Sequence, residues 1–522
     1  MKKNLAVKAC SLLISAAMIS SLAGCGNDSN STSEGGSSEG GQSSNPPVSD
    51  ESPEETSEIS ASDASSAEDG DAAAEGEEKY DFGGATIRVS GAYWAGLSEE
   101  NEGTPDYLIA QELLPQLEEK YNIDIQYVKL EGDDGYNTSE LIQASITGGE
   151  CYADLFSAGG DITLALRNYL VDNTDTKESL GIGSIYLEPA TWNGRTYGFS
   201  CENMGNCYAL VYSREYLNSI GMDVTPTDKF LAGEWSYDDC IEYLSEMKAK
   251  LPEGEYPIAV NTNHWVSMAP AANGTVSIDS DGGIHLTDDA YIESLEFYRQ
   301  LITLGLAAPI KDVQQNEDGS ISADQSAGSM SGPSQANGFV IGMAEHWWMN
   351  SLEESIGQWG IVPWPWGSNV TCEGDYTTLS DNYHTAQIMW TNMVAPQADY
   401  RAESAKNIPD DVLLKIGLDW CDMMDPAGAA ARQAAFAAEQ NGQTYENLGY
   451  EAGTLRYFST KEDADLYDWM HSRVVVDWGH TLNSYVRVYR NALSVIGAGT
   501  DARSSGQSFT QDGEAAMAEA FQ

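Results

Sequence analysis

Apolar side chains recur at two different spacings along the first part of the folded region, and the two spacings alternate. Short apolar or alternating runs predict strands at Ala85–Val89, Ile123–Val128 and Ala153–Phe156. Helical spacing lies between them, at residues 106–121 and 140–146. This strand-helix-strand-helix-strand order is typical of a parallel sheet covered by helices. The pattern therefore predicts an α/β fold, in which ligands bind beyond the carboxyl ends of the strands.

The residues that follow two of these strands are the first candidates for a binding site. Tyr93 and Trp94 come after the first strand, and Asp161 comes after the third. Aromatic rings and carboxylates are the groups that a site for a polar, partly apolar ligand uses. Core packing is the alternative for Trp94, and capping of a helix that starts at Ile162 is the alternative for Asp161.

The N-terminus has the pattern of an export signal. It starts with three basic residues, Lys2, Lys3 and Lys8. An uncharged apolar stretch follows from Ala9 to Leu22 and is too short for an ordinary membrane-spanning helix. The run Leu-Ala-Gly that ends at Cys25 resembles the lipobox of bacterial lipoproteins. That resemblance implies removal of residues 1–24, acylation of Cys25 and attachment to the extracytoplasmic face of the cell membrane. An ordinary signal peptide that happens to contain a cysteine is the alternative.

The segment from Cys25 to residue 79 is predicted to be a disordered acidic linker. Between residues 26 and 78 it has 15 acidic residues, no basic residue and no aromatic residue. Such a composition buries too little apolar surface to offset the entropy of ordering. Even as an ideal flexible coil, this segment spans roughly 40 Å.

The rest of the chain has the composition of a strongly acidic globule. All 13 Trp and all 27 Tyr lie beyond residue 79. Its net charge is near −43, because 23 of the 26 basic residues but 66 of the 81 acidic residues lie beyond residue 78. A field of this sign repels nucleic acids and anionic lipid headgroups, which excludes both as partners. The length is sufficient for two domains.

The cysteines and histidines carry no recognisable metal or catalytic motif. Six cysteines remain in the body, and an extracellular location permits disulfides as well as buried thiols. Cys201 and Cys207 are close enough in sequence to pair across a turn. No zinc-type spacing, nucleophile elbow, HExxH or P-loop is present, so no metal or cofactor is expected, and the six histidines stand singly.

A series of short motifs resembles the family 1 extracellular solute-binding proteins, the sugar-binding components of ABC importers. Thr191–Phe199 resembles the family's W-x-G-K-x-Y-G hairpin, with Asn193-Gly194 as the turn. Cys207–Gly221 is similar to the strand and helix that follow it. Trp235–Asp239 resembles the T-W-x-E helix start, with Ser236 as N-cap. Gly342–Trp348 and Gly360–Gly367 resemble the G-x-A-A-M strand and the v-x-P-x-P-x-G signature, and all these pieces occur in the family's order.

The resemblance implies a two-lobed periplasmic-binding-protein-like fold that closes on its ligand by hinge motion. Lobe one is expected to comprise residues 80–205 and 393–475, and lobe two residues 206–392 and 476–522. Chain crossings are expected near 203–207, 388–394 and 474–478. A monomer that captures a mono- or oligosaccharide and delivers it to the permease subunits of an ABC transporter is the implied function, with no catalysis.

Sugar sites pair aromatic platforms with polar side chains that bind hydroxyl groups. The candidates at strand ends or at the lobe junction are Tyr93, Trp94, Asp161, Glu202, Asn203, Trp265, Glu345, Trp347 and Trp364. For each Trp the alternative is core packing, and Trp192 is assigned to the packing of the hairpin.

Three other functions remain open at this stage. A lipid-anchored glycoside hydrolase needs two facing carboxylates, and a chain with 66 acidic residues beyond its linker cannot exclude such a pair by sequence. A binding protein for a non-sugar solute would share the fold. A surface adhesin would also carry an anchor and a stalk, but the chain has no internal repeat.

Overall fold

The structure is a computed structural model that describes residues 80–129, 138–160, 162–201, 208–315, 321–324, 337–345, 357–388, 390–442, 458 and 460–521. The expected signal peptide, Cys25 and the acidic linker lie outside these residues.

The first sheet contains the three strands expected from the sequence. It has five strands in the order β2 (Ile123–Tyr127), β1 (Ala85–Gly91), β3 (Leu155–Ala158), β14 (Asn392–Val394) and β6 (Gly198–Ser200). β1 is parallel to β2 and β3, whereas β14 is antiparallel to β3 and β6. The predicted parallel sheet is therefore confirmed. Two strands from elsewhere in the chain extend it: β14 runs antiparallel to its neighbours, and β6, beyond β14, runs in the same direction as β3.

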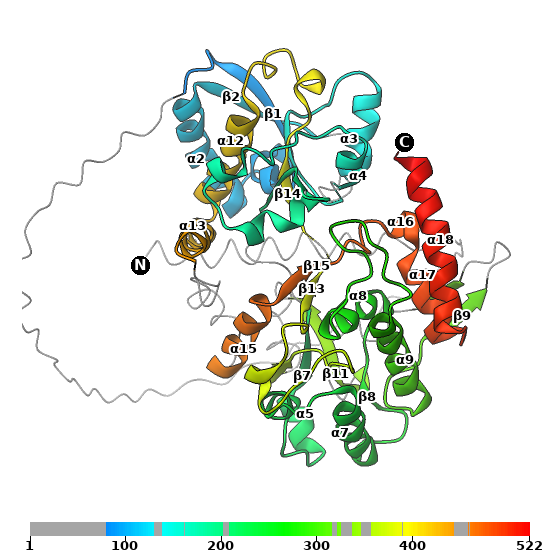
Figure 1. Cartoon of the computed structure of the whole chain (residues 1–522). Helices are drawn as coiled ribbons and strands as arrows, with labels where there is room; N and C mark the ends of the chain where they lie inside the picture. The colour runs from blue at the N-terminus through cyan, green and yellow to red at the C-terminus, as the bar shows by residue number, and fades with distance from the viewer. Residues whose placement is uncertain are drawn as a thin grey trace, which may run out of the picture. The chain divides into compact units, whose positions relative to one another are not determined.

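Amphipathic helices flank the first sheet. α2 (Pro105–Tyr121) runs antiparallel to its neighbouring strands and is capped by the side chain of Thr104. In Figure 1, α2 and α12 (Asp410–Met424) lie together beside β1 and β2. α3 (Thr138–Thr147) and α4 (Ile162–Leu166) precede and follow β3, and α13 (Pro426–Gln440) packs on α12. The strands and helices together bury Ile87, Val89 and Leu155 completely.

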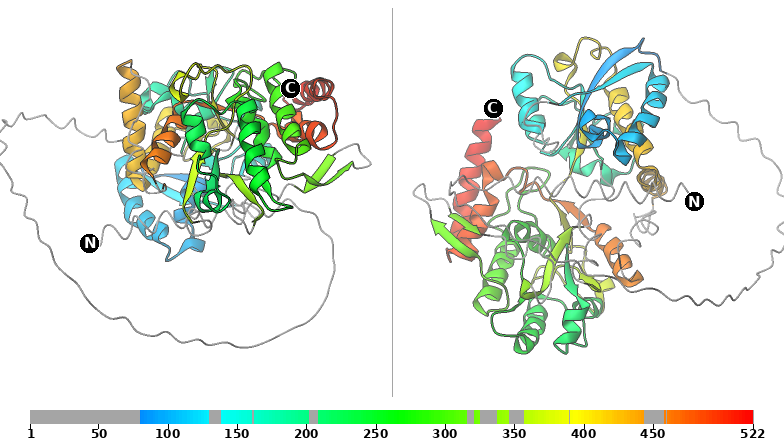
Figure 2. Two further views of the ribbon diagram at one scale, coloured as in Figure 1. Left: turned by 90° about the horizontal axis from the view of Figure 1, so that it is seen from below. Right: turned by 180° about the vertical axis from the view of Figure 1, so that it is seen from behind.

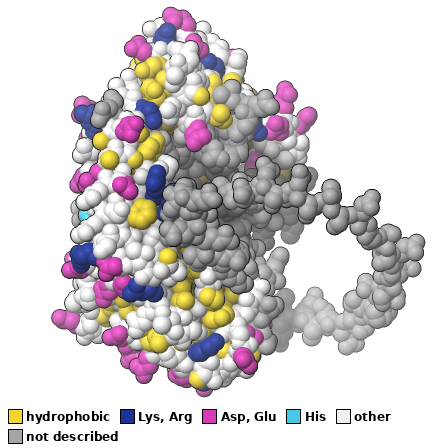
Figure 3. All heavy atoms as spheres, turned by 90° about the vertical axis from the view of Figure 1, so that its right-hand side faces the viewer, with side chains coloured by type: hydrophobic (Ala, Val, Ile, Leu, Met, Phe, Trp, Pro, Cys, Tyr) yellow, Lys and Arg dark blue, Asp and Glu magenta, His cyan; other side chains and the backbone are white. Residues whose placement is uncertain are grey.

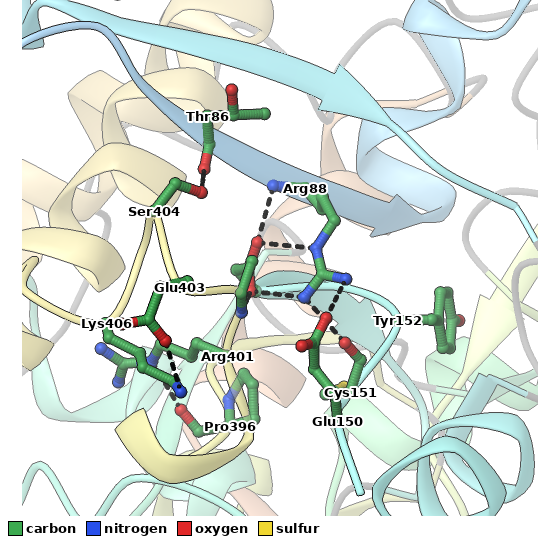
Figure 4. A network of polar contacts seen from close by, with 12 residues as sticks. Thr86, Arg88, Glu150, Cys151, Tyr152, Pro396, Arg401, Glu403, Ser404 and Lys406 are labelled. Atoms are coloured by element: carbon green, nitrogen blue, oxygen red, sulfur yellow. Dashed lines mark hydrogen bonds and ion pairs between the residues drawn. The ribbon is translucent and has the colours of Figure 1, made fainter. Parts of the chain in front are cut away.

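A buried ion pair fixes β1 to the start of β3 (Figure 4). Arg88 donates from Nε and Nη2 to the carboxylate of Asp154 at 3.0 and 2.9 Å, and Asp154 is fully buried. The same carboxylate accepts the backbone N–H of Ala402 at 2.7 Å. Arg88 also donates to Glu150 at 2.9 Å. Because every Asp154 oxygen is engaged, the network compensates the desolvation of its charge and holds three segments in register.

The second sheet has four strands in the order β12 (Trp359–Val362), β7 (Tyr208–Ser213), β11 (Phe339–Glu345) and β8 (Tyr256–Ile258). β7 is antiparallel to β11 and β12, and β8 is parallel to β11. Helices α5 (Arg214–Ser219), α6 (Pro226–Leu231) and α7 (Tyr237–Lys250) follow β7. The N-cap expected at Ser236 is confirmed as a capping box with Asp239.

The C-terminal helices also pack on the second half of the molecule. α8 (Thr262–Ala272) contacts α17 (Val488–Ala492), and α9 (Asp289–Thr303) contacts α18 (Ala502–Ala520). α16 (Asn483–Val486) packs against α18. In both views of Figure 2 the red α18 runs alongside the orange-red α16 and α17. β9 (Lys311–Gln315) and β10 (Ile321–Asp324) form a separate antiparallel pair.

The chain passes between the two sheets at three places, two of them as expected. It leaves the first sheet after β6 and enters the second at β7, and it returns between β13 (Thr385–Gln387) and β14. The third passage differs from the expectation of 474–478. The ring of Phe458 lies 5.2 Å from that of Trp359 in β12, and α15 (Lys461–His471) also contacts β12, so both pack on the second sheet. Residues 458–475 therefore belong with lobe two rather than lobe one.

The expected hinge segment at residue 474 is instead a strand of a separate pair. β15 (Val474–Val476) runs parallel to β13, with Thr385 opposite Val474 and Gln387 opposite Val476. We call these two strands the β13–β15 pair. One of them leads directly into the second passage between the sheets, so the pair lies at the junction of the two halves.

The expected hairpin is also present. β4 (Thr191–Trp192) pairs with β5 (Arg195–Thr196), and both turn residues, Asn193 and Gly194, have positive φ. This is the geometry of a type I′ turn, for which Asn-Gly is the preferred sequence.

Candidate functional site

The carboxyl end of β1 does not expose the Trp that the sequence proposes as a ligand platform. Trp94 is fully buried, and its ring stacks on Trp420 at 5.2 Å with an 8° interplanar angle. Its neighbour Tyr93 is half-buried, and the Tyr93 carbonyl accepts the indole N–H of Trp420 at 2.8 Å. Of these two residues, therefore, only Tyr93 keeps surface at the end of the strand.

Two further platforms proposed from the sequence lie in the core of the second half. Trp265 is fully buried, and Trp364 is 1% exposed. Their rings meet edge to face at 5.3 Å, and each indole N–H donates to a backbone carbonyl, Ser294 for Trp265 and Tyr208 for Trp364. These two rings, like that of Trp94, pack against protein in this structure and have no open face for a sugar.

Most of the remaining candidates cannot be placed. Asp161, Glu202, Asn203 and Trp347 lie outside the described residues. The backbone of Glu345 ends β11 opposite Tyr208, and its side chain is also outside them. For these residues, ligand contact stays a prediction.

A pair of histidines that the sequence did not single out lies at the same end of the second sheet. His264 is in the first turn of α8, which follows the carboxyl end of β8, and its ring lies 4.7 Å from that of Tyr208 at the start of β7. His480 follows the β13–β15 pair, and its Nδ1 is hydrogen-bonded to the hydroxyl of Tyr489. We call His264 and His480 the histidine pair. Both side chains are half-buried.

Burial keeps both histidines uncharged at neutral pH. It lowers the pKa of His264 to about 3, with a further contribution from the proximity of His480. It lowers the pKa of His480 to about 4. A neutral imidazole offers one hydrogen-bond donor and one acceptor. The enclosed Nδ1 of His264 has no hydrogen-bond partner among the residues that the structure describes.

The histidine pair lies next to a contact between the two halves. A Cβ atom placed on Gly160, in the loop after β3, would lie 3.8 Å from the methyl group of Thr481, the residue after His480. Arg167 of the first half lies over the ring of Phe521 at the end of α18, at 5.5 Å. The end of β3 and the segment after β15 therefore approach each other beside the histidines.

The segment after β15 is held by a buried carboxylate. Asp477 is fully buried and accepts hydrogen bonds from Ser277 Oγ at 2.6 Å and from the N–H groups of Ile278 and Gly479 at 3.2 and 2.9 Å. The ring of the next residue, Trp478, meets those of Trp192 at 5.4 Å and Trp390 at 4.7 Å, both edge to face. Trp390 lies in the passage that leads to β14. Aromatic packing thus joins the hairpin, this passage and the segment after β15.

Several polar atoms around this junction have no partner among the described residues. They are Asp477 Oδ2, Gln387 Nε2 and the indole nitrogens of Trp390 and Trp478. Buried polar atoms are normally hydrogen-bonded, so such a concentration indicates either enclosed water or a ligand.

A pocket of about 540 Å³ lies between the hairpin, the turn at residues 278–284 and the β13–β15 pair. Glu188 and Thr191 line it from the first half, and Asp279, His285 and His384 line it from the second. His285 is hydrogen-bonded through Nε2 to Asp279 and through Nδ1 to Asp288, both at 2.8 Å. Burial would lower the pKa of His285, but the bonds to these two carboxylates outweigh it and raise the pKa.

The turn at residues 278–284 also touches the hairpin directly. The backbone N–H of Asn193 donates to the Ser280 carbonyl at 2.6 Å. A Cβ atom on Gly282 would lie 3.2 Å from the Trp192 ring, and Gly282 has φ +84°. Trp192 therefore does more than pack the hairpin, because its ring also contacts lobe two.

Sequence reasoning missed the histidine pair, Gln387, Trp390 and Asp477. Glu202 and Asn203 became candidates because they lie beside a passage between lobes, and the same argument covers Gln387, Trp390 and Asp477. The histidines carried no motif, and only the fold places residues 264 and 480 side by side.

The described residues contain neither a cluster suited to a metal ion nor a helix suited to crossing a membrane. Within the described ranges, no group of three or more His, Cys, Asp or Glu side chains is arranged to hold a metal ion. Among the described helices, none combines the length and the apolar composition that crossing a bilayer requires. Cys151, Cys240, Cys372 and Cys421 carry free thiols, and Cys207, which is close enough in sequence to pair with Cys201, lies outside the described residues.

Three solved structures of bacterial binding proteins share this architecture. The galacto-N-biose/lacto-N-biose I-binding protein of an ABC transporter from Bifidobacterium longum, in complex with lacto-N-biose, has a TM-score of 0.53 and 11% identity, over 84% of this chain and 98% of that one. The cyclic α-maltosyl-1,6-maltose binding protein of Arthrobacter globiformis has a TM-score of 0.53 and 12% identity, over 83% and 99%. UgpB of Mycobacterium tuberculosis, in complex with glycerophosphocholine, has a TM-score of 0.51 and 14% identity, over 84% and 100%.

The chain has the two-lobed solute-binding fold. At these identities the likeness establishes the fold alone. No protein-family model matches the sequence, and no curated protein sequence matches it. The expected two-lobed α/β architecture is thus confirmed, and its ligand and partners are matters for the proposal that follows.

Proposed function

We propose that this chain is the substrate-binding lipoprotein of an ABC transporter and captures a mono- or oligosaccharide between its two lobes. The observation that carries the proposal is the solute-binding fold itself, with two sheets joined by three chain passages. Two of the similar structures are described as sugar-binding proteins. The motif series from Thr191 to Gly367 supports the same ligand class.

Capture follows from contacts that span the lobes. A ligand shifts a protein toward its closed state only by binding that state more tightly, so it must touch both lobes. The loop at Gly160 and the segment at His480–Thr481 come from different lobes and lie together. A sugar bound there would contact both lobes and favour closure. The closed form would then dock on the permease.

Export and anchoring form the second part of the proposal. Acylation of Cys25 would hold the protein on the extracytoplasmic face of the cell membrane, and the acidic linker would keep the body away from the surface. The protein would act as a monomer without a cofactor. Replacement of Cys25 by Ser should release it from the membrane fraction into the medium, which fractionation of expressing cells measures.

The test of the ligand class is a thermal-shift screen of a soluble form that begins at residue 26. Sugars are compared with amino acids, peptides and polyamines, because a ligand that binds only the folded state must raise the melting temperature. A sugar that stabilises the protein and is recovered intact supports the proposal. A sugar recovered in cleaved form would favour the glycoside hydrolase instead, and stabilisation by a control solute alone would replace the ligand class.

Small-angle scattering tests the closure. With the stabilising ligand present, the radius of gyration of the body should decrease. An unchanged radius would contradict hinge closure.

A further inference from the structure

The histidine pair is placed where a captured ligand would meet polar side chains. His264 lies in the first turn of α8, the helix that follows the carboxyl end of β8, and ligands bind at this end of parallel strands in α/β proteins. His480 adjoins Thr481, which lies beside the loop that follows β3 of the other lobe. The pair therefore lies where the ends of strands from both sheets come together.

The pair has unused hydrogen-bonding capacity. Nδ1 of His264 is enclosed and has no partner within the described part of the chain, although the residue as a whole is only half-buried. Leaving such an atom unpaired costs free energy, which a ligand that supplies a hydrogen bond would recover. Nδ1 of His480 is occupied by Tyr489, which fixes the orientation of the ring.

The electrostatic character of the pair decides which ligands fit. Both imidazoles are neutral near pH 7, because burial lowers the pKa of His264 to about 3 and that of His480 to about 4. Neutral rings cannot balance a phosphate or a carboxylate. Two described rings contact them, Tyr208 and Tyr489, and burial raises the pKa of Tyr489, so its hydroxyl is uncharged near pH 7. The body around them carries a large negative charge. Hydroxyl groups, which donate and accept, match neutral imidazoles in either tautomer.

We propose that His264 and His480 contact hydroxyl groups of the bound ligand and select uncharged polyhydroxylated molecules over phosphorylated or carboxylated ones. The inference rests on the proposed capture of a carbohydrate and narrows its ligand class to neutral sugars. It sets this chain apart from a binding protein whose ligand carries a phosphodiester.

Titration calorimetry on the soluble form from residue 26 tests the selection. The probes are glucose, galactose, maltose and cellobiose, with glucose 6-phosphate and glucuronate as charged counterparts of glucose and with glycerophosphocholine as a zwitterionic phosphodiester. We expect binding of at least one neutral sugar and at least tenfold weaker binding of its charged counterparts. Charged compounds that bind as tightly as the neutral sugars would overturn the inference and leave capture of a carbohydrate intact. Failure of every probe would count against the proposed function as well.

Variants then test the two residues with the neutral sugar that binds. His264→Ala and His480→Ala should each weaken its binding at least tenfold, and His264→Asn, which keeps a donor and an acceptor, should recover most of the affinity. Unchanged affinity in both alanine variants would remove the pair from the site, while sugar capture would stand.

A pH series covers the case in which the alanine variants fail to fold. With the wild-type protein, affinity for the same sugar should stay constant from pH 8 to pH 5, because His264, His480 and Tyr489 all keep their neutral forms there. Affinity that falls with a midpoint near 6.5 would show that a histidine with an ordinary pKa governs binding, and would overturn the inference.

Discussion

Arg214 donates two hydrogen bonds from Nη2 to the fully buried carboxylate of Asp463, at 3.0 and 2.8 Å. Arg214 follows β7 and Asp463 lies in the first turn of α15, so the pair ties this late helix to the second sheet. Asp463 also accepts the N–H of Ile361 in β12 at 3.1 Å. This pair is a direct reason why residues 458–475 belong to lobe two.

Removal of this carboxylate should destabilise the protein strongly. Asp463→Ala leaves Nη2 of the half-buried Arg214 guanidinium and the buried Ile361 N–H without their carboxylate acceptor, and we expect a loss of about 3–5 kcal/mol in the free energy of unfolding. Urea unfolding measures it. Asp465→Ala, on the same helix, removes only an exposed pair with Lys461 and should cost about 0.5 kcal/mol or less. Equal losses in the two variants would show that the buried pair has no special role.

Trp94 should prove to be a stability residue. Its truncation to Ala removes a fully buried ring and its stacking on Trp420, with an expected cost of about 3–5 kcal/mol. The affinity of the remaining folded protein for its ligand should change less than about threefold, since the ring has no open face. Denaturation and calorimetry on the same sample separate these effects. A large loss of affinity with normal stability would return Trp94 to the binding site.

The contact between Trp192 and Gly282 should be sensitive to a single methyl group. Gly282→Ala and Gly254→Ala both place a side chain at positive φ, which costs about 1–2 kcal/mol. Only Gly282 faces a neighbour, the Trp192 ring at 3.2 Å, whereas Gly254 has nothing within 4 Å. We therefore expect Gly282→Ala to lower the melting temperature more than Gly254→Ala does. Gly282→Ala should also change the radius of gyration, whereas Gly254→Ala should leave the radius unchanged. Equal melting temperatures and equal radii of gyration in the two variants would mean that the turn at residues 278–284 accommodates the methyl group without a movement of the lobes.

The histidine pair predicts lower stability in mild acid. The folded pKa values of His264 and His480 lie near 3 and 4, below the unfolded value near 6.5. As the pH falls from about 7 to about 4, the unfolded chain takes up protons that the folded chain refuses, so the free energy of unfolding decreases. His384, whose pKa is lowered by burial and by Arg473, acts in the same direction. Chemical denaturation of the wild type and of His264→Asn should show a smaller pH slope in the variant.

His285 should make a contribution to the free energy of unfolding that depends on pH in the opposite direction. Its folded pKa is raised, so its contribution to stability is fully present below about 6.5 and is lost as the pH rises through the folded value. His285→Gln should therefore destabilise the protein at pH 5.5 more than at pH 9, as urea unfolding at the two values would measure. A constant difference between wild type and variant would indicate that the ring acts by shape alone. Neighbouring charged groups, Asp279, Asp288 and Glu188, are present in both proteins and cancel in the comparison.

The distribution of charged side chains on the surface does not mark the position of a binding site. On the face shown in Figure 3, acidic and basic side chains lie interspersed over the described surface. The sequence predicts the sign of the overall field, while individual ion pairs such as Lys461 with Asp465 depend on helical spacing.

Local patterns predicted the elements well because their causes are local. The strand alternation at Ile123–Val128, the Asn193-Gly194 turn and the Ser236 cap each depend on neighbouring residues. The site was harder because it depends on distant ones. Whether Trp364 faces a ligand or the core is decided by Trp265 and Tyr208, far away in the chain. The membership of α15 was missed for the same reason, since Arg214 and Asp463 carry no pattern that links them.

The place of β14 in the first sheet has a consequence for how the protein is made. β14 lies between β3 and β6, yet it follows both in the chain only after the whole second sheet. Until residue 394 has been synthesised, β3 lacks one neighbour and β6 lacks its only one in this sheet. Unpaired strand edges are templates for association with other chains. Synthesis of lobe one thus begins first, but its sheet is completed only after the second sheet has been made. A chain interrupted before β14 exposes unpaired edges of β3 and β6, which β14 covers in the finished protein.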